Sequence, residues 1–305
     1  MRWSRGHTGG IEDRRADGGL GGFGGMSMGG GGGGIPIPVG VGGTGGLIIA
    51  VIIIVLNLLG SSGGGSGTGS GGLGDALNPY GGQAADPGGS VDLTNNGDLV
   101  QFVGFVLDDT NALWADTFKR AGQSYTPAKM VLFKDATQGG CGPASADTGP
   151  FYCPEDQKVY LDLGFFQELK QRFGAPGDFA QAYVIAHEVG HHVQQQTGIE
   201  QQVTQLEQQD PSRQNELSVK LELQADCLAG VWAETVYKRG DLDPGDVDEA
   251  LQAASAVGDD RIQASAGQRV NPETWTHGSA EQRSSWFKKG MNGGDPAACD
   301  TFAGQ

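Results

Sequence analysis

Apolar residues at helical spacing recur through the last two thirds of the chain and predict a mainly helical domain. Residues 92–121 carry Leu, Phe, Val and Trp three and four positions apart, which predicts one long or two short helices. The same spacing predicts helices over 165–173, 182–197, 217–237, 247–264 and 279–289. Apolar runs at 129–134 and 158–163 predict two strands. The pattern therefore indicates an α+β fold, mainly helical with a small β-sheet.

Glycine dominates the first third of the chain and sets it apart from the predicted domain. The sequence has 305 residues, of which 55 are Gly, and most of these precede residue 90. Residues 1–38 hold too few apolar side chains to pack a core, which predicts a disordered tail. Residues 60–90, rich in Gly and Ser, predict a flexible linker. We therefore expect one folded domain over residues 91–305.

One uncharged apolar run, residues 47–59, interrupts the Gly-rich region. Extended back to residue 39, it reaches the about 20 residues that a bilayer requires. A cleaved signal peptide is disfavoured because the run begins deep in the chain and no small-residue cleavage site follows it. A buried core segment is disfavoured because Gly tracts isolate the run. We predict one transmembrane helix over residues 39–59, with the Arg-bearing tail 1–38 in the cytoplasm and the domain outside.

The net charge of −16 at pH 7 narrows the set of partners. An acidic protein is repelled by the phosphates of nucleic acids, so we expect no nucleic-acid partner. The same charge favours solubility of the domain. The pattern specifies no oligomeric state.

The motif HEVGH, from His187 to His191, lies inside the helix predicted over 182–197. Residues four apart lie on one helix face, so both imidazoles can reach a single metal ion. Glu188 lies beside the first ligand, where its carboxylate can contact a metal-bound water instead of the metal. The competing interpretation is a surface helix with two solvated histidines. The uncharged residues before the motif favour a buried zinc hydrolase site.

A catalytic zinc site uses three protein ligands and leaves the fourth position to water. The helix predicted over 217–237 carries Glu222 and Asp226 four residues apart, and two like charges at that spacing repel each other on a surface. We predict that Glu222 is the third ligand and that Asp226 accepts the ring N–H of a ligating histidine. Glu216 and Glu234 are competing third ligands, and an exposed acidic helix face is the competing interpretation.

Several longer motifs carry a resemblance to a known family. They are MRW at 1–3, EDRR at 12–15, CGPASADTGPFYCP at 141–154, HEVGHHVQ at 187–194, ELQADCLAGVW at 222–232 and THGSAEQR at 276–283. Together they resemble the bacterial neutral zinc metallopeptidases of the YpfJ type. The resemblance implies a zincin-like α+β domain on one membrane span, a Zn²⁺ cofactor and a peptide or protein substrate. The chain would lie in the bacterial inner (plasma) membrane with its catalytic domain extracytoplasmic.

His277 lies in a Gly/Ser turn before the helix predicted over 279–289. It is either a neighbour of a helix cap without chemistry or a donor to the oxyanion on the scissile carbonyl, by analogy with other zincins. We include His277 as a catalytic candidate beside Glu188. Arg283 has two interpretations as well: an oxyanion donor, or the ion-pair partner of an acid such as Glu281.

The four cysteines show no C-x-x-C spacing, which argues against zinc binding by thiolates. Free buried thiols are one interpretation. If the domain lies outside the cytoplasm, Cys141 can pair with Cys153, and Cys227 with Cys299. The second bridge would tie the C-terminal tail to the helix that carries Glu222.

These features together predict a membrane-anchored zinc metallopeptidase. His187, His191 and Glu222 would bind Zn²⁺, and Glu188 would act as the general base for the metal-bound water. An extended substrate would pair with the strand over 159–163. The alternative is a membrane-tethered binding or scaffold protein with a structural zinc site and no turnover. A non-peptide amidase or esterase is a third interpretation, and the sequence does not specify which bonds are cleaved.

Overall fold

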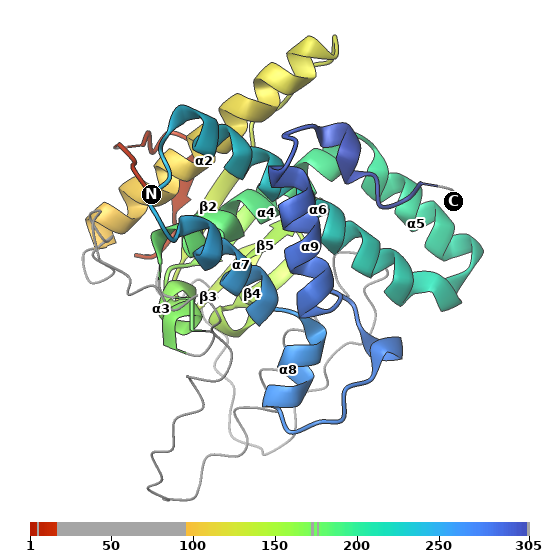
Figure 1. Cartoon of the computed structure of the whole chain (residues 1–305). Coiled ribbons are helices and arrows are strands. Elements are labelled where there is room, and N and C mark those ends of the chain that lie inside the picture. The colour runs from red at the N-terminus through yellow and green to blue at the C-terminus, as the bar shows by residue number, and fades with distance from the viewer. Residues whose placement is uncertain (5, 17–95, 172–173, 176, 304–305) are drawn as a thin grey trace, which may run out of the picture.

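The structure is a computed structural model of the chain, in which residues 1–4, 6–16, 96–171, 174–175 and 177–303 are described. Figure 1 shows a small sheet beside a larger group of helices. Helix α4 lies between the sheet and helix α6, and α9 runs along α6. The described residues therefore form the mainly helical α+β fold that the apolar pattern predicts.

The larger sheet has four strands in the order β1-β2-β6-β5. Its members are β1 (Ile11–Asp13), β2 (Lys129–Phe133), β6 (Lys158–Asp162) and β5 (Phe151–Cys153). β1, β2 and β6 run parallel, and β5 is antiparallel to β6. A separate hairpin joins β3 (Ala136–Gly139) to β4 (Gly142–Ser145). The two predicted strands are β2 and β6, the central pair, whose apolar runs fit burial on both faces.

The helices follow the strands and fill the rest of the described chain. They are α2 (Asn96–Arg120), α3 (Gly164–Gln171), α4 (Asp178–Gln196), α5 (Ile199–Gln209), α6 (Gln214–Arg239), α7 (Asp246–Ala256), α8 (Asp259–Ser265) and α9 (Ala280–Met291). Helix α4 is buried throughout from Phe179 to Gln194, because the sheet, α2, α6 and α7 all pack on it. A helix covered on every side needs uncharged residues on every side, which accounts for the composition around the motif.

One predicted helix is divided in the structure. The periodic run over 247–264 forms α7 and α8, which are separated at Gly258. A β-carbon at Gly258 would lie 2.3 Å from the backbone nitrogen of Ala280, the first residue of α9. The chain therefore passes directly against the start of α9 at this point, and the close approach requires Gly.

The prediction of a disordered tail over residues 1–38 is wrong for the described residues before 17. Strand β1 pairs with β2, and the ring of Trp3 packs edge-on against Phe102 of α2 with centroids 5.3 Å apart. The backbone nitrogen of Gly6 donates to the carbonyl of Gln101, 3.2 Å away. Backbone hydrogen bonds and ion pairs, among them Glu12 with Lys158, make many of these contacts. A count of apolar residues therefore underestimates the tendency of this segment to pack on the domain.

The α-ammonium group of Met1 lies among acidic side chains at the start of α4. Its nitrogen is 2.7 Å from Asp178 and 3.2 Å from Asp246. Burial lowers the pKa of this ammonium, but the hydrogen bond and the charge of Asp178 outweigh burial and raise it overall. The contact joins the first residue of the chain to α4 and α7.

The predicted transmembrane helix over 39–59 and the predicted linker over 60–90 lie outside the described residues. Among the helices that are described, none combines the length and the apolar character needed to cross a bilayer. The described part of the domain resumes at Asn96 with α2.

Candidate metal centre

Helices α4 and α6 bring His187, His191 and Glu222 together. One ligand atom from each residue lies within 4.8 Å of the other two. The Nε2 atom of His187 is 3.2 Å from one Glu222 oxygen, and Nε2 of His191 is 3.5 Å from the other. All three side chains are buried. Two imidazoles and one carboxylate are a donor set that fits Zn²⁺ with a fourth position left for solvent.

The structure separates Glu222 from the competing acids on α6. Glu216 pairs with Arg213 and Lys220 on the exposed side of the helix. Glu234 pairs with Lys238. Only Glu222 of these three acids lies with the two histidines.

A glycine allows α4 and α6 to approach closely beside the metal cluster. A β-carbon at Gly190 would lie 3.1 Å from the α-carbon of Ala225. Glycine in mid-helix costs roughly 1 kcal/mol relative to Ala, so its place within the motif indicates a steric requirement. The close approach lets His187 and His191 of α4 and Glu222 of α6 reach the same metal ion.

The Nδ1 atom of each histidine has a fixed hydrogen-bond partner. Nδ1 of His187 is 2.9 Å from Asp226, as predicted for that aspartate. Nδ1 of His191 is 2.8 Å from the side-chain oxygen of Gln194. When the rings bind a metal, hydrogen bonds at Nδ1 leave Nε2 of both rings free of a proton and directed to the Glu222 side. Gln194 was not among the predicted site residues.

The electrostatics of the cluster favour a cation. Burial alone would raise the pKa of Glu222, but hydrogen bonds and charge from His187 and His191 hold it well below its usual range. Burial lowers the pKa of His191, yet the hydrogen bond and charge of Glu222 dominate and raise it to about 10. Protons thus occupy the imidazoles when no metal is bound, and a metal ion must displace them.

Glu188 is buried beside the three potential ligands but lies outside the group that could hold the ion. Burial raises the pKa of its carboxyl, and the charges of His191 and His187 oppose that effect only in part. A carboxylate with a raised pKa, adjacent to a metal site, has the properties of a general base that operates near neutral pH.

His277 is buried in front of α9 and is held by Asp259, the first residue of α8. Its Nδ1 is 3.1 Å from an Asp259 oxygen, and the other oxygen of Asp259 accepts the backbone N–H of His277 at 2.7 Å. Nε2 of His277 is buried and has no hydrogen-bond partner among the described residues. The charge of His277 contributes, after those of nearer groups, to the low pKa of Glu222. Asp259 was not among the predicted site residues.

Arg283 is not paired with Glu281. Its guanidinium is buried and forms an ion pair with Asp226, with Nε 2.8 Å from one carboxylate oxygen. The structure therefore favours the ion-pair interpretation of Arg283, with a different acid from the one that the sequence suggested.

Both predicted disulfides are present. Cys141 is bonded to Cys153, and Cys227 to Cys299. The second bond attaches the segment after α9 to α6, one residue from Asp226. No described cysteine is free.

The strand over 159–163 cannot pair with a substrate as predicted. It corresponds to β6, which already has β2 on one side and β5 on the other. The outer edge of β5 is the sheet edge nearer α4, since Tyr152 of β5 hydrogen-bonds His192 of α4 at 3.0 Å.

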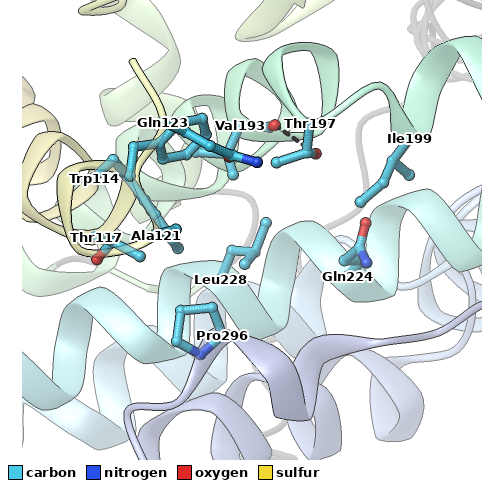
Figure 2. Close-up of a pocket in the computed structure, with 11 residues that line it drawn as sticks. Trp114, Thr117, Ala121, Gln123, Val193, Thr197, Ile199, Gln224, Leu228 and Pro296 are labelled. Atoms are coloured by element: carbon cyan, nitrogen blue, oxygen red, sulfur yellow. Dashed lines mark hydrogen bonds between the residues drawn. The ribbon is translucent and has the colours of Figure 1, made fainter. Parts of the chain in front are cut away.

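A cavity of about 190 Å³ lies between the same helices but away from the metal cluster. Figure 2 shows Val193 of α4 and Gln224 of α6 at its wall. These residues come two positions after His191 and Glu222, which is roughly 200° round a helix. The cavity and the metal cluster therefore lie on different faces of α4 and α6.

The profile of one protein family, described as "Putative neutral zinc metallopeptidase", matches residues 1–302. The chain is 49% identical to YpfJ of Escherichia coli K12 over 209 residues, which are 68% of this chain and 73% of that protein. It is 50% identical to Mb2605 of Mycobacterium bovis and to Rv2575 of Mycobacterium tuberculosis H37Rv over 190 residues, 59% of this chain and 64% of each relative. No solved structure matches the chain. This chain belongs to the neutral zinc metallopeptidase family, whose cofactor is Zn²⁺.

Proposed function

We propose that the protein is a zinc-dependent peptidase in which His187, His191 and Glu222 hold the ion and Glu188 is the general base. One observation carries the proposal. The three potential ligands converge from two helices, and a fourth buried group, Glu188, lies beside them without joining them. A purely structural zinc site usually has four protein ligands and needs no adjacent base.

The residues of the chain have separate tasks in peptide hydrolysis. Bound Zn²⁺ supplies Lewis acidity, which polarises the scissile carbonyl and acidifies water. Glu188 accepts one proton from the attacking water and delivers it to the amine that leaves. The carbonyl carbon gains the water oxygen and loses the amine nitrogen, so one water is consumed for each peptide bond. When both ring nitrogens of His277 carry a proton, Asp259 holds Nδ1–H and Nε2–H donates to the oxyanion.

The outer edge of β5 is the proposed binding site for the substrate backbone. No described strand lies beyond β5 in the sheet, so an extended peptide can be added there as a further strand. The hydrogen bond between Tyr152 and His192 holds β5 against α4, and the disulfide between Cys153 and Cys141 joins β5 to the β3–β4 hairpin. The substrate strand is therefore expected beside β5 and not beside β6, because β2 and β5 occupy both edges of β6.

The test is digestion of a peptide library by the full chain, with and without a chelator. Glu188→Gln should keep one zinc per chain and lose about 10²- to 10⁴-fold in kcat/KM, because it removes the base and not a ligand. Glu216→Gln, a change of the same type on the exposed side of α6, is the matched control. Cleavage by Glu188→Gln at the wild-type rate would exclude this role. Peptide binding without any cleavage would instead favour a binding protein with a structural zinc.

We infer that any attachment to a membrane leaves residues 1–16 and the domain in one compartment. Hydrogen bonding between β1 and β2 and the ion pair of Met1 with Asp178 support this inference. A single crossing between residues 16 and 96 would separate these partners by a bilayer. The two disulfides favour an oxidising compartment. The inference replaces the expected cytoplasmic location of the N-terminus.

Protease accessibility in intact cells can test this topology. Cleavage sites for an added protease are inserted near residues 17 and 94 of the full chain, one at a time. We expect both sites to be cut, or both to be protected, in spheroplasts. Cleavage of the second site alone would instead support a single membrane crossing between the two sites.

A further inference from the structure

We propose that Arg283 of α9 is the positioning residue of the metal site, acting through Asp226 on His187. The proposal rests on the proposed metal site, but it does not depend on which bond the protein cleaves. No contact of Arg283 with substrate is required. Its task is to hold Asp226 in the orientation that hydrogen-bonds the ligand ring.

The contacts of Asp226 carry the first step. Nε of Arg283 is 2.8 Å from one Asp226 oxygen, and Nη2 is 3.0 Å from the other, so the pair is bidentate. The oxygen that Nη2 contacts also accepts from Nδ1 of His187 and from the hydroxyl of Tyr183. Asp226 is fully buried and Arg283 is 3% exposed. A bidentate pair fixes the plane of the carboxylate, and that plane fixes the ring of His187.

The charge of Arg283 carries the second step. Asp226, Glu222 and Glu188 are three buried carboxyl groups; the first two contact His187, and Glu188 follows it in the chain. A bound Zn²⁺ offsets two negative charges when all three are ionised, and one remains. Arg283 supplies the missing positive charge, with Nη2 also 3.5 Å from Glu222.

The packing of α9 on α6 explains how Arg283 reaches this position. A β-carbon at Gly230 of α6 would lie 2.1 Å from the carbonyl oxygen of Phe287, and one at Gly290 of α9 would lie 1.9 Å from that of Cys227. Two glycines, one on each helix, thus allow backbone to touch backbone and fix the register. Arg283 lies seven residues before Gly290 on the same face of α9, which aligns it with Asp226 beside Cys227.

The test measures zinc affinity by competition with a chelator. Arg283→Gln should weaken binding about 10- to 100-fold, the usual effect of removing a partner of a metal ligand. Arg283→Lys restores the charge but not the bidentate geometry, so an intermediate affinity is expected. Arg261→Gln on α8, where the side chain is exposed, is the matched control and should bind zinc as the wild type does.

A double variant distinguishes positioning from general support of the fold. If Arg283 acts through Asp226, Arg283→Gln combined with Asp226→Asn should weaken zinc binding by much less than the product of the two single effects. A folded Arg283→Gln protein with wild-type zinc affinity would overturn the proposal. If Arg283→Gln does not fold, Arg283→Lys decides, and unchanged affinity in that variant also overturns it. Absence of zinc binding in the wild type would refute the metal site itself.

Discussion

His277 is the residue whose surroundings are the least evident from the sequence. In the sequence it is a lone histidine in a turn, while in the structure Asp259 holds its Nδ1 and leaves Nε2 buried without a described partner. A buried polar atom without a partner costs free energy. Under the proposed function, a hydrogen bond to the substrate oxyanion would remove that cost.

His277→Gln should therefore lower kcat/KM by about 10²- to 10³-fold, the usual loss on removal of one oxyanion donor. Zinc content should not change, because His277 is not among the three ligands. The measurement is steady-state kinetics on a peptide selected from the library, with metal analysis of the same samples. Loss of zinc together with activity would assign His277 to the metal site instead.

The spacing of a motif predicts only the partners on its own helix. His187, Glu188 and His191 follow from helical spacing alone, and Glu222 follows from its i,i+4 relation to Asp226. The sequence could not exclude Glu216, because the direction of each face of α6 depends on packing. Gln194 accepts from His191 three residues away, so spacing could have identified it. Asp259 could not have been found, since it meets His277 only through tertiary structure.

At the scale of elements, α4 depends on a contact from α7 at its first turn. The backbone N–H of Phe179 donates to the carboxylate of Glu249, 3.1 Å away. Burial, followed by the charges of Asp178 and Asp246, raises the pKa of Glu249 to about 7. The folded state therefore binds more protons than the unfolded state between the ordinary pKa of a glutamate and about pH 7.

The sign of this effect gives a prediction for stability against pH. A raised carboxyl pKa makes a contribution that is present at low pH and is lost as the pH rises toward 7. Glu249→Gln keeps an acceptor for Phe179 and removes the titration. We expect a smaller fall in Tm between about pH 5 and pH 7 in this variant than in the wild type. Parallel Tm profiles for the two proteins would show that Glu249 does not titrate in this range.

The strands differ in how far their own sequence, apart from distant contacts, predicts them. β2 and β6 carry long apolar runs because both of their faces are buried, and the pattern predicts them. β1 has the sequence Ile-Glu-Asp with two exposed residues, and its place in the sheet comes from backbone pairing with β2. β5 is equally short. No periodicity can predict strands of this length, since the stabilising contacts come from residues more than a hundred positions apart in the case of β1.

For the whole molecule, the fold is completed by its first sixteen residues. A chain that starts at residue 96 would lack β1 and would expose the edge of β2, where Met130 and Leu132 bond Gly10 and Arg14. An uncovered edge strand promotes aggregation, so we expect a lower Tm and aggregation on heating. A synthetic peptide of residues 1–16 should raise the Tm again. The same peptide with an acetylated amine should be less effective, because acetylation removes the charge that Asp178 binds. Equal Tm values for the shortened and full chains would contradict the role of β1.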